Sequence, residues 1–448
     1  MLARYRRVTL LLTAASLLAY PACADSFTDA LTATYQNNPG IKAERDRQRA
    51  TDEEVSQALS GFRPNVSASY SRGRQRSAFG GADWNNGDSE NASLTLRQPL
   101  FRSGGTLSSY NAAKQRARAG EQQLTAREQR VLMDAVTSYV DVTAAASILQ
   151  ISRENEATLT KQLNASRERF EVGEVTRTDV AQSEARLSIA RTQVINAEGS
   201  LISAIAAFER VIGYKPEGML DQPIQFPELP LSLQEALEQA RASNPELLRA
   251  IHLAKSSEYD VWTNKSAILP RVDLVGSMVR QEGVGVIGNN KFDQDSIAVE
   301  LTVPIYQAGA EYSRVREAKS VARQRQYERD DTKLNVEQAV SRAWEQLETA
   351  RSTIRSREGQ IQAAQVALDG VRQEQEYGAR TVLDVLDAEQ ELFSARTALV
   401  QAQRDRVVAT YNVLLTLGRM TPSYLQLPVA QYDAREHYDD TKWLPIGF

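Results

Sequence analysis

Hydrophobic positions along the chain change their spacing from helical to alternating and back to helical, and this succession occurs twice. Alternation of apolar with polar side chains is typical of a strand that has one apolar and one polar face. It predicts two strands in each half of the chain, at about 62–76 and 92–101, then at about 270–281 and 295–305. The Gly, Asn and Asp-rich stretches 77–91 and 281–295 are expected to be solvated loops between the strands of each pair.

Each strand pair is preceded by two shorter helices and followed by long ones. In the first half, one short helix is expected at 27–36 and a second from the following Asn-Pro to about 59. In the second half, the corresponding helices are expected at 233–242 and from the following Asn-Pro to about 267. No proline occurs in 100–215 or 305–421, so long helices are predicted at about 105–172, 174–212, 310–377 and 379–417. At about 1.5 Å per residue, the first of these would reach roughly 100 Å.

The returning helices carry apolar residues every seven positions, and a seven-residue repeat specifies coiled-coil packing rather than a globular core. In the first half these positions are Leu187, Val194, Leu201 and Phe208, and in the second Leu386, Phe393, Val400, Val407 and Leu414. Gly173 and Gly378 mark the points where each long helix reverses.

The two halves are copies of one design, displaced by about 205 residues. The matched positions include Asn38-Pro39 with Asn244-Pro245, Gly104 with Gly309, Gly173 with Gly378, and Asp179-Val180 with Asp384-Val385. We therefore divide the chain into a first repeat at 25–222, a Pro-rich linker at 223–230, a second repeat at 231–420 and a C-terminal tail at 421–448.

The N-terminus has the features of a secretory signal peptide. Three arginines precede an apolar run, and Ala22-Cys23-Ala24 supplies small residues at the positions a signal peptidase recognises. Cleavage after Ala24 would remove residues 1–24, the only cysteine and three of the 53 basic residues, leaving 50 against 57 acidic ones. The alternative is a lipidated Cys23, but Tyr20 stands where a lipidation signal favours leucine.

Composition narrows the function. A chain of 448 residues would ordinarily form several globular domains, yet only 7% of its residues are aromatic and its mean hydropathy is −0.43, as expected of long helices with narrow apolar seams. A net charge of −4 argues against nucleic-acid binding. Two histidines and one cysteine nearly exclude a zinc site, so no metal and no cofactor is expected. Outside the signal peptide, no stretch approaches the roughly 20 consecutive apolar residues of a membrane-spanning helix.

Four strands are too few to close a barrel, and an open sheet in lipid would leave its edges unsatisfied. Three copies would supply twelve strands, an even number within the range of outer-membrane barrels, with Arg97 and Glu300 facing a wet lumen. The predicted fold is therefore mainly α with a small β part: a duplicated helix-strand-strand-helix protomer whose trimer forms a 12-stranded barrel continuous with a long periplasmic α-helical coiled-coil tunnel.

The signal peptide, the duplicated plan and three short motifs resemble the TolC family of outer-membrane efflux and secretion channels. The motifs are Gln98-Pro99-Leu100-Phe101, Val303-Pro304-Ile305-Tyr306 and the run from Val382 to Ala388. The resemblance implies a homotrimer in the outer membrane that extends into the periplasm. It would be the passive, gated exit duct of a tripartite efflux pump or type I secretion system, working with a periplasmic adaptor and an inner-membrane RND or ABC transporter. It implies neither an enzyme nor a nucleic-acid partner.

Two groups of candidate residues follow from the pattern and the resemblance. Pro64, Pro99, Pro270 and Pro304 lie at predicted strand ends and would form the elbows between barrel and tunnel, although ordinary strand-end prolines would look the same. Asp384 and Asp387 share a helix face at a hairpin tip, which by spacing alone favours a solvated acidic face. In the family, the matching aspartates ring the periplasmic entrance, where crowding would raise their pKa values and bind cations.

A third candidate group is a polar latch. Arg380 on one tip, with Thr178 and Asp179 on the other, resembles the links that hold the family's entrance shut, although simple surface pairing is the alternative. Gln375 stands where the family can offer a latch tyrosine, with Tyr377 two residues on. Gly173 and Gly378 would turn the chain and present the tips to an adaptor. The competing function is a periplasmic coiled-coil structural or adaptor protein without a pore, and an enzyme is a more distant alternative.

Overall fold

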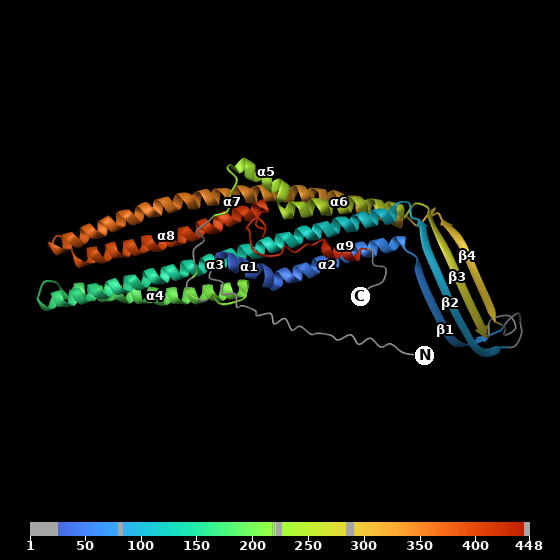
Figure 1. The fold of residues 1–448 in the computed structure, drawn as a ribbon, viewed down its shortest axis with the longest axis horizontal. Helices are drawn as coiled ribbons and strands as arrows, with labels where there is room; N and C mark the ends of the chain where they lie inside the picture. Colours follow the sequence, from blue (N-terminus) through green and yellow to red (C-terminus); the bar gives the residue numbers. More distant parts are fainter. Residues whose placement is uncertain are drawn as a thin grey trace, which may run out of the picture.

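A computed structural model describes residues 26–78, 84–216, 218, 220, 226–283 and 291–442. The protein is a long rod of helices with a four-stranded sheet projecting from one end (Figure 1). The predicted signal peptide and the first residues of the predicted linker lie outside this described part.

The two halves of the chain contain the same elements in the same order. The first half consists of α1 (Phe27–Asn37), α2 (Pro39–Leu59), the 3-10 turn η1 (Ser60–Phe62), β1 (Asn65–Ser77), β2 (Asn85–Phe101), α3 (Gly105–Glu171) and α4 (Arg177–Ile212). The second half consists of α5 (Leu233–Ser243), α6 (Pro245–Ser266), β3 (Arg271–Gly283), β4 (Phe292–Thr302), α7 (Ala310–Glu376) and α8 (Val382–Leu417). A short α9 (Glu436–Thr441) lies in the tail.

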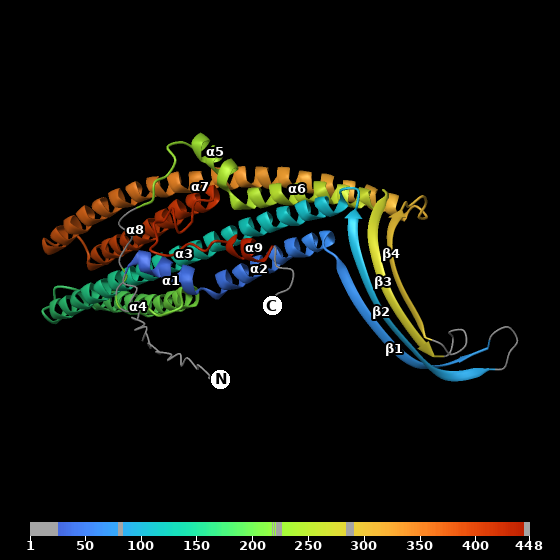
Figure 2. The same cartoon turned by 45° about the vertical axis from the view of Figure 1, so that its right-hand side comes forward.

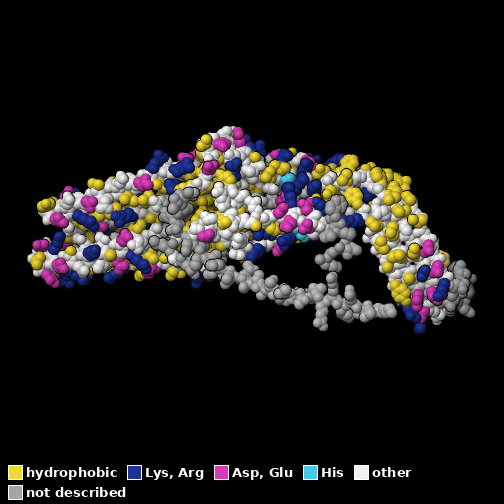
Figure 3. All heavy atoms as spheres, in the orientation of Figure 1, with side chains coloured by type: hydrophobic (Ala, Val, Ile, Leu, Met, Phe, Trp, Pro, Cys, Tyr) yellow, Lys and Arg dark blue, Asp and Glu magenta, His cyan; other side chains and the backbone are white. Residues whose placement is uncertain are grey.

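The strands form one antiparallel sheet in the order β1-β2-β3-β4, so β1 and β4 are its edges. Figure 2 shows the strands curving away from the helical rod. Cross-strand partners lie on the same face of a sheet. The register therefore places most of the large apolar residues of the four strands on one face, and most of the hydroxyl-bearing residues on the other, together with Val275 and Val279 of β3. Yellow side chains cover much of the sheet in Figure 3.

The predicted bounds of three strands were wrong. β1 begins at Asn65 rather than near 62, because Ser60–Phe62 forms a 3-10 turn. β2 begins at Asn85 rather than near 92, so the second half of the stretch expected to be a solvated loop at 77–91 is strand. Its polar residues join the ladder because Arg72 of β1 forms ion pairs with Asp88 and Glu90, both at 3.3 Å. β4 covers 292–302 rather than 295–305, since Pro304 cannot donate to a ladder.

The long helices form two antiparallel hairpins. α3 and α7 each contain 67 residues, and α4 and α8 each contain 36. α4 and α8 begin at Arg177 and Val382, three residues later than predicted, because the turn after each long helix includes the N-cap threonine of the returning one. The hairpins lie side by side over most of the rod, with α6 against α3 and α7 (Figures 1 and 2).

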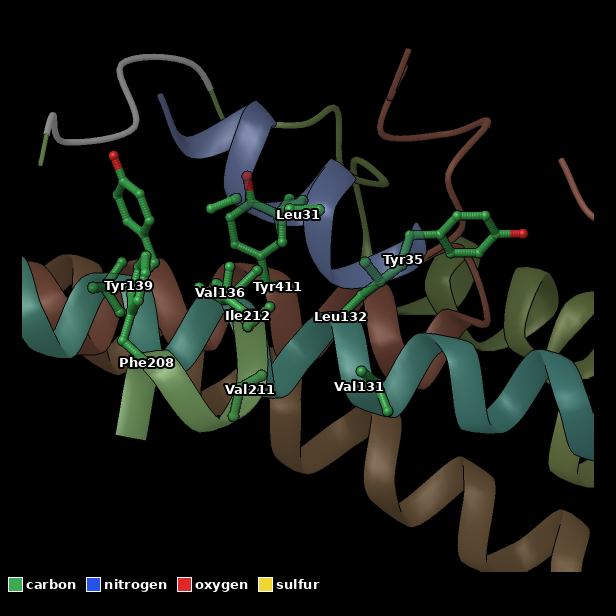
Figure 4. Packing of buried hydrophobic residues seen from close by; sticks show 14 of the residues in the cluster. Leu31, Tyr35, Val131, Leu132, Val136, Tyr139, Phe208, Val211, Ile212 and Tyr411 are labelled. Carbon is green, nitrogen blue, oxygen red and sulfur yellow. The ribbon is translucent and has the colours of Figure 1, made fainter. Parts of the chain in front are cut away.

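The largest core cluster lies midway along the rod, where α1 is packed against α3, α4 and α8. Tyr139, Phe208 and Ile212 are fully buried there (Figure 4). Phe27 meets Tyr139 edge-on with ring centroids 5.2 Å apart. By length and composition alone, α3 contains a stretch apolar enough to cross a membrane, although its apolar residues are not consecutive. Half of that stretch is buried inside the protein, as in a core helix.

The C-terminal tail returns to the first repeat. α9 lies beside α2, where His437 Nε2 is 3.1 Å from a carboxylate oxygen of Glu53 and Arg435 is 3.3 Å from Glu121. Close by, Asp52 is only 2% exposed and accepts a hydrogen bond of 2.8 Å from Gln48. Burial raises the pKa of Asp52 to about 7, and the charges of Glu121 and Glu53 add to that shift.

Candidate functional site

The two hairpin tips at the end of the rod farthest from the sheet have the same backbone geometry. Gly173 and Gly378 adopt φ values of +83° and +76°, a left-handed conformation that favours glycine. In each turn the residue after the glycine donates its N–H to a carbonyl in the last turn of the long helix, from Glu174 to Arg169 at 2.9 Å and from Ala379 to Glu374 at 2.8 Å. An added Cβ at either glycine would meet no atom within 4 Å, so only the backbone angle requires glycine.

Each returning helix begins with a capping box. At the first tip, the Thr176 N–H and hydroxyl both donate to one Asp179 oxygen at 2.8 Å, and the Asp179 N–H donates to the threonine hydroxyl at 3.2 Å. Thr381 and Asp384 repeat this arrangement at the second tip, with distances of 2.9, 2.8 and 3.3 Å. Asp179 and Asp384 therefore cap their helices, in addition to the latch and constriction roles predicted for them.

The two candidate constriction carboxylates differ in environment. The hydrogen bonds from Thr381 hold the pKa of Asp384 below its ordinary value, with a smaller contribution from the charge of Arg380. This direction is opposite to the rise expected from crowding, because the capping box stabilises the charged form in the protomer. Asp387 forms an ion pair with Arg186 of α4, and so connects the two hairpins.

Apolar packing also joins the tips. Val382 and Leu386 of α8 are buried against Leu159, Leu163 and Leu187 of the first hairpin. The Arg186–Asp387 ion pair lies alongside this cluster on the same pair of helices. The sequence reasoning missed Arg186, since its position is separated from Asp387 by 201 residues and no local pattern connects the two.

Within one protomer, the structure does not bring the candidate latch residues together. Arg380 donates to Glu374 of its own tip at 2.8 Å, rather than to Asp179 or Thr178. Thr178 is exposed in the first turn of α4, and Asp179 is engaged by Thr176. A contact of Arg380 with Thr178 or Asp179 between protomers stays a prediction.

The elbow prolines occupy two different kinds of position. Pro64 and Pro270 immediately precede β1 and β3, and Pro304 comes two residues after β4. Pro99 lies two residues before the end of β2, at an irregularity where the pairing with β3 shifts between Pro99 and Phe101. A bulge accommodates the proline because the residue at an irregularity need not donate to the ladder.

A buried carboxylate connects the strands to the first long helix at the elbow. Asp273 of β3 is 2.8 Å from Arg102 and 3.5 Å from Arg97, and Arg97 also lies 3.8 Å from Glu300 of β4. The Ser103 hydroxyl donates to the Pro270 carbonyl at 2.6 Å. These contacts set the direction of the sheet relative to α3. Arg102 also lines a polar cavity of about 580 Å³ that lies between the strands and the helices.

No group of His, Cys, Asp or Glu residues in the described part of the chain is arranged to hold a metal ion. His252 lies 2.9 Å from the amide oxygen of Gln115, and burial lowers its pKa. Both described histidines form polar contacts within the protein, His252 with Gln115 and His437 with Glu53. The chemistry available at the tips and the elbow is that of ion pairs and hydrogen bonds.

Comparisons with known proteins agree on one class of protein. The model of the outer membrane efflux protein family matches residues 30–214 and 236–419, one match in each repeat. The outer membrane efflux protein BepC of Brucella suis is 35% identical over 432 residues, covering 96% of this chain and 94% of BepC. The alkaline protease secretion protein AprF of Pseudomonas aeruginosa is 26% identical, covering 94% of this chain and 90% of AprF.

The fold is also that of a solved channel. The crystal structure of the CmeC outer membrane channel of Campylobacter jejuni superimposes with a TM-score of 0.79 at 18% identity. The superposition covers 93% of this chain and 89% of CmeC. At that identity the likeness concerns the fold alone, and it extends over both the sheet and the helical hairpins.

Proposed function

Because this chain belongs to the outer membrane efflux protein family and is an outer-membrane channel of the kind used in efflux and secretion, we propose that three copies assemble into one conduit. Their twelve strands would close a barrel in the outer membrane. Their helical hairpins would form a tunnel through the periplasm that is closed at the tips when at rest.

The open sheet is the observation that carries this proposal. Among the described residues, β1 and β4 have no strand paired along their outer edges, and the apolar face bears exposed Tyr70, Leu94, Ile297 and Leu301. In lipid, unpaired backbone groups cost several kcal/mol each, so the edges need partners. Additional copies of the same sheet supply those partners and leave the apolar face toward lipid and the polar face toward a lumen.

The helices support the same assembly. Ile195 and Ile202 of α4 are 67% and 68% exposed, and Tyr327 and Leu334 of α7 are 72% and 64% exposed. Each pair is spaced seven residues apart, which is the spacing of a coiled-coil seam. Packing of these positions against a neighbouring copy would bury side chains that one protomer leaves in water.

The gate is proposed at the tips. Three copies would gather six carboxylates from Asp384 and Asp387, and would bring Arg380 of one tip near Thr178 and Asp179 of a neighbour. Like charges close together attract cations, and an Arg to carboxylate bond is strong enough to close a tip yet reversible. The Arg186–Asp387 ion pair would connect this ring to the first hairpin of the same protomer.

The partners are a periplasmic adaptor and an inner-membrane RND or ABC transporter, which would supply the energy. Val172 and Tyr377 next to the tip glycines are exposed apolar side chains that an adaptor could cover. The relatives include one named for efflux and one named for protease secretion. Both routes require an outer-membrane exit duct.

Planar-bilayer recording of the purified protein tests the proposal. We expect small, cation-selective conductance steps from a species with the mass of three chains, and recovery of the protein in the outer-membrane fraction. A protein that fractionates with the soluble periplasm and gives no conductance would instead be the structural or adaptor protein that lacks a pore.

A further inference from the structure

The internal duplication extends to the pairing register of the strands. Val66 of β1 lies opposite Leu96 of β2, and Val272 of β3 lies opposite Leu301 of β4. Val272 is the counterpart of Val66 in the second repeat, and Leu301 is the counterpart of Leu96, so the two pairs are equivalent. These counterparts are defined by Pro64 with Pro270, and by Gln98-Pro99 with Val303-Pro304. The two hairpins therefore share one register rule.

The junction between the repeats has no counterpart within one chain. β2 is paired with β3, with Leu94 opposite Met278. The equivalent junction in the duplicated design joins β4 to a β1, and the β1 of the same chain lies at the far edge of the sheet. Only another copy of this chain can supply it.

We propose that β4 of one copy pairs antiparallel with β1 of the next in the register that the β2–β3 junction dictates. That register puts Val299 opposite Arg72, Leu301 opposite Tyr70 and Asp295 opposite Arg76 of the neighbouring copy. The inference rests on the proposed trimer and specifies its interface, which the trimer alone does not determine.

The charges at the two edges support this pairing. Arg76 is exposed and its guanidinium lies over the Trp84 ring at 5.0 Å, and Asp295 is exposed on the opposite edge. Within the described part of the protomer, neither forms an ion pair, whereas Arg72, Arg74 and Asp293 on the same face each do. The proposed register was derived without reference to charge, yet it brings together two oppositely charged side chains that have no ion-pair partner among the described residues.

Two further pairs at the interface are also compatible. Tyr70 and Leu301 are each 65% exposed at their own sheet edge, and opposite one another they would form an aromatic–aliphatic pair on the lipid-facing side. On the lumen side, Ala298 would lie opposite Gly73, where an added Cβ meets no atom within 4 Å. Neither pair introduces crowding or a buried charge.

Alternation limits the competing registers. A slip by one residue would turn the apolar face of one sheet toward the lumen, so only even shifts are competitors. A slip by two would place Asp293 opposite Arg76, and Ser296 rather than Ala298 opposite Gly73. Charge attraction alone does not distinguish these arrangements, whereas a distance-sensitive crosslink does.

Paired cysteines in the full-length protein measure the register directly. Cleavage at the predicted signal peptide leaves no other cysteine in the chain. Directly opposed Cα atoms lie about 4.5–5.5 Å apart, within disulfide range, while a pair displaced by two residues lies at about 7–8 Å, outside it. The test pair is Gly73→Cys with Ala298→Cys. The displaced controls combine Gly73→Cys with Ser296→Cys or with Glu300→Cys.

After mild oxidation of outer membranes, we expect the test pair to yield covalent trimers on non-reducing gels, and each displaced pair to yield at least tenfold fewer. A covalent trimer that forms preferentially from a displaced pair would overturn the register while leaving the proposed function intact. A uniformly monomeric protein in mild detergent, measured by light scattering before oxidation, would instead overturn the proposed trimer.

Charge reversal provides an independent measurement. Arg76→Asp or Asp295→Arg alone should lower the temperature at which trimers dissociate, and the two together should restore it. Restoration by Arg76→Asp with Asp293→Arg, but not with Asp295→Arg, would contradict the proposed register even if the cysteine variants failed to fold.

Discussion

The carboxylate of Asp273 lies 2.8 Å from the guanidinium of Arg102, and the Asp273 side chain is only 2% exposed. The contact joins the first residues of β3 to the turn before α3. It has no counterpart in the duplicated position, where Ser67 and Gln307 stand. The elbow is therefore stabilised differently at its two junctions, despite the repeated plan.

Asp273→Asn should destabilise the protein by about 1–3 kcal/mol, because it leaves two arginines facing a neutral amide. The partial exposure of Arg97 and Arg102 keeps the loss below that of a fully buried pair. Thermal unfolding in detergent, followed by circular dichroism, measures the change. Glu300→Gln is the matched control, since its 3.8 Å contact is half exposed and should contribute less than about 1 kcal/mol. Equal effects of the two substitutions would contradict a special role for the buried carboxylate.

Replacing both Asp384 and Asp387 with alanine should abolish block of the channel by polyvalent cations added from the periplasmic side, because it removes the six carboxylates of the proposed ring. Asp384→Ala also removes a capping box, which costs about 1 kcal/mol. Thr381→Ala controls for that loss, since it breaks the cap but retains both carboxylates. Undiminished block in the double variant would refute the assignment of the ring.

Arg380→Ser should raise the resting conductance if Arg380 holds the tips of neighbouring protomers together. Its contact with Glu374 in the same tip provides the control: Glu374→Gln breaks that 2.8 Å ion pair and leaves the arginine in place. We expect single-channel recording to show a larger resting conductance for Arg380→Ser than for Glu374→Gln. Resting conductance that is unchanged in Arg380→Ser, or raised equally in both, would argue against a latch between protomers.

Asp52 should make stability depend on pH near neutrality. Its folded-state pKa of about 7 lies above the ordinary value of about 3.9, so folding takes up a proton between these two pH values. The contribution of Asp52 protonation to the free energy of unfolding is fully present below about pH 4, and it is lost as the pH rises to about 7. Asp52→Asn, which can still accept from Gln48, should therefore raise the melting temperature at pH 8 and have little effect at pH 4. Glu53→Gln is the control, and a pH-independent effect of Asp52→Asn would be inconsistent with this titration.

Gly418→Ala should be far more destabilising than Gly213→Ala, although the two glycines are counterparts with left-handed backbones. The φ penalty for an L-residue is about 1–2 kcal/mol at either position. Only at Gly418 would the new Cβ lie 2.3 Å from a backbone atom, the carbonyl oxygen of Ser243, whereas Gly213 has open space. Urea unfolding of the two variants compares them, and similar losses would show that the contact with α5 is easily relaxed.

The sequence by itself determined the parts of this protein that depend on local pattern. Proline-free spans and heptads located the four long helices, and alternation located the strands. Because the chain is duplicated, each element predicted in one half could be checked against the matching positions of the other half. These signals are local because helix and strand periods record which face of an element meets solvent. The polar start of β2 was missed for the same reason: from Asn85 to Asn91 the strand is stabilised by pairing and ion pairs, and has no apolar face to reveal it.

Only the tertiary structure decided which distant residues meet. Arg186 and Asp387 are paired across two hairpins, and Asp273 is buried between arginines from a neighbouring strand and turn. Each contact depends on how rigid elements pack, and composition or spacing cannot specify this when the partners are far apart in the chain. The capping boxes at the tips depend on both. The sequence contains their Thr-to-Asp spacing, but the lowered pKa of Asp384 follows only from the hydrogen bonds of the folded turn.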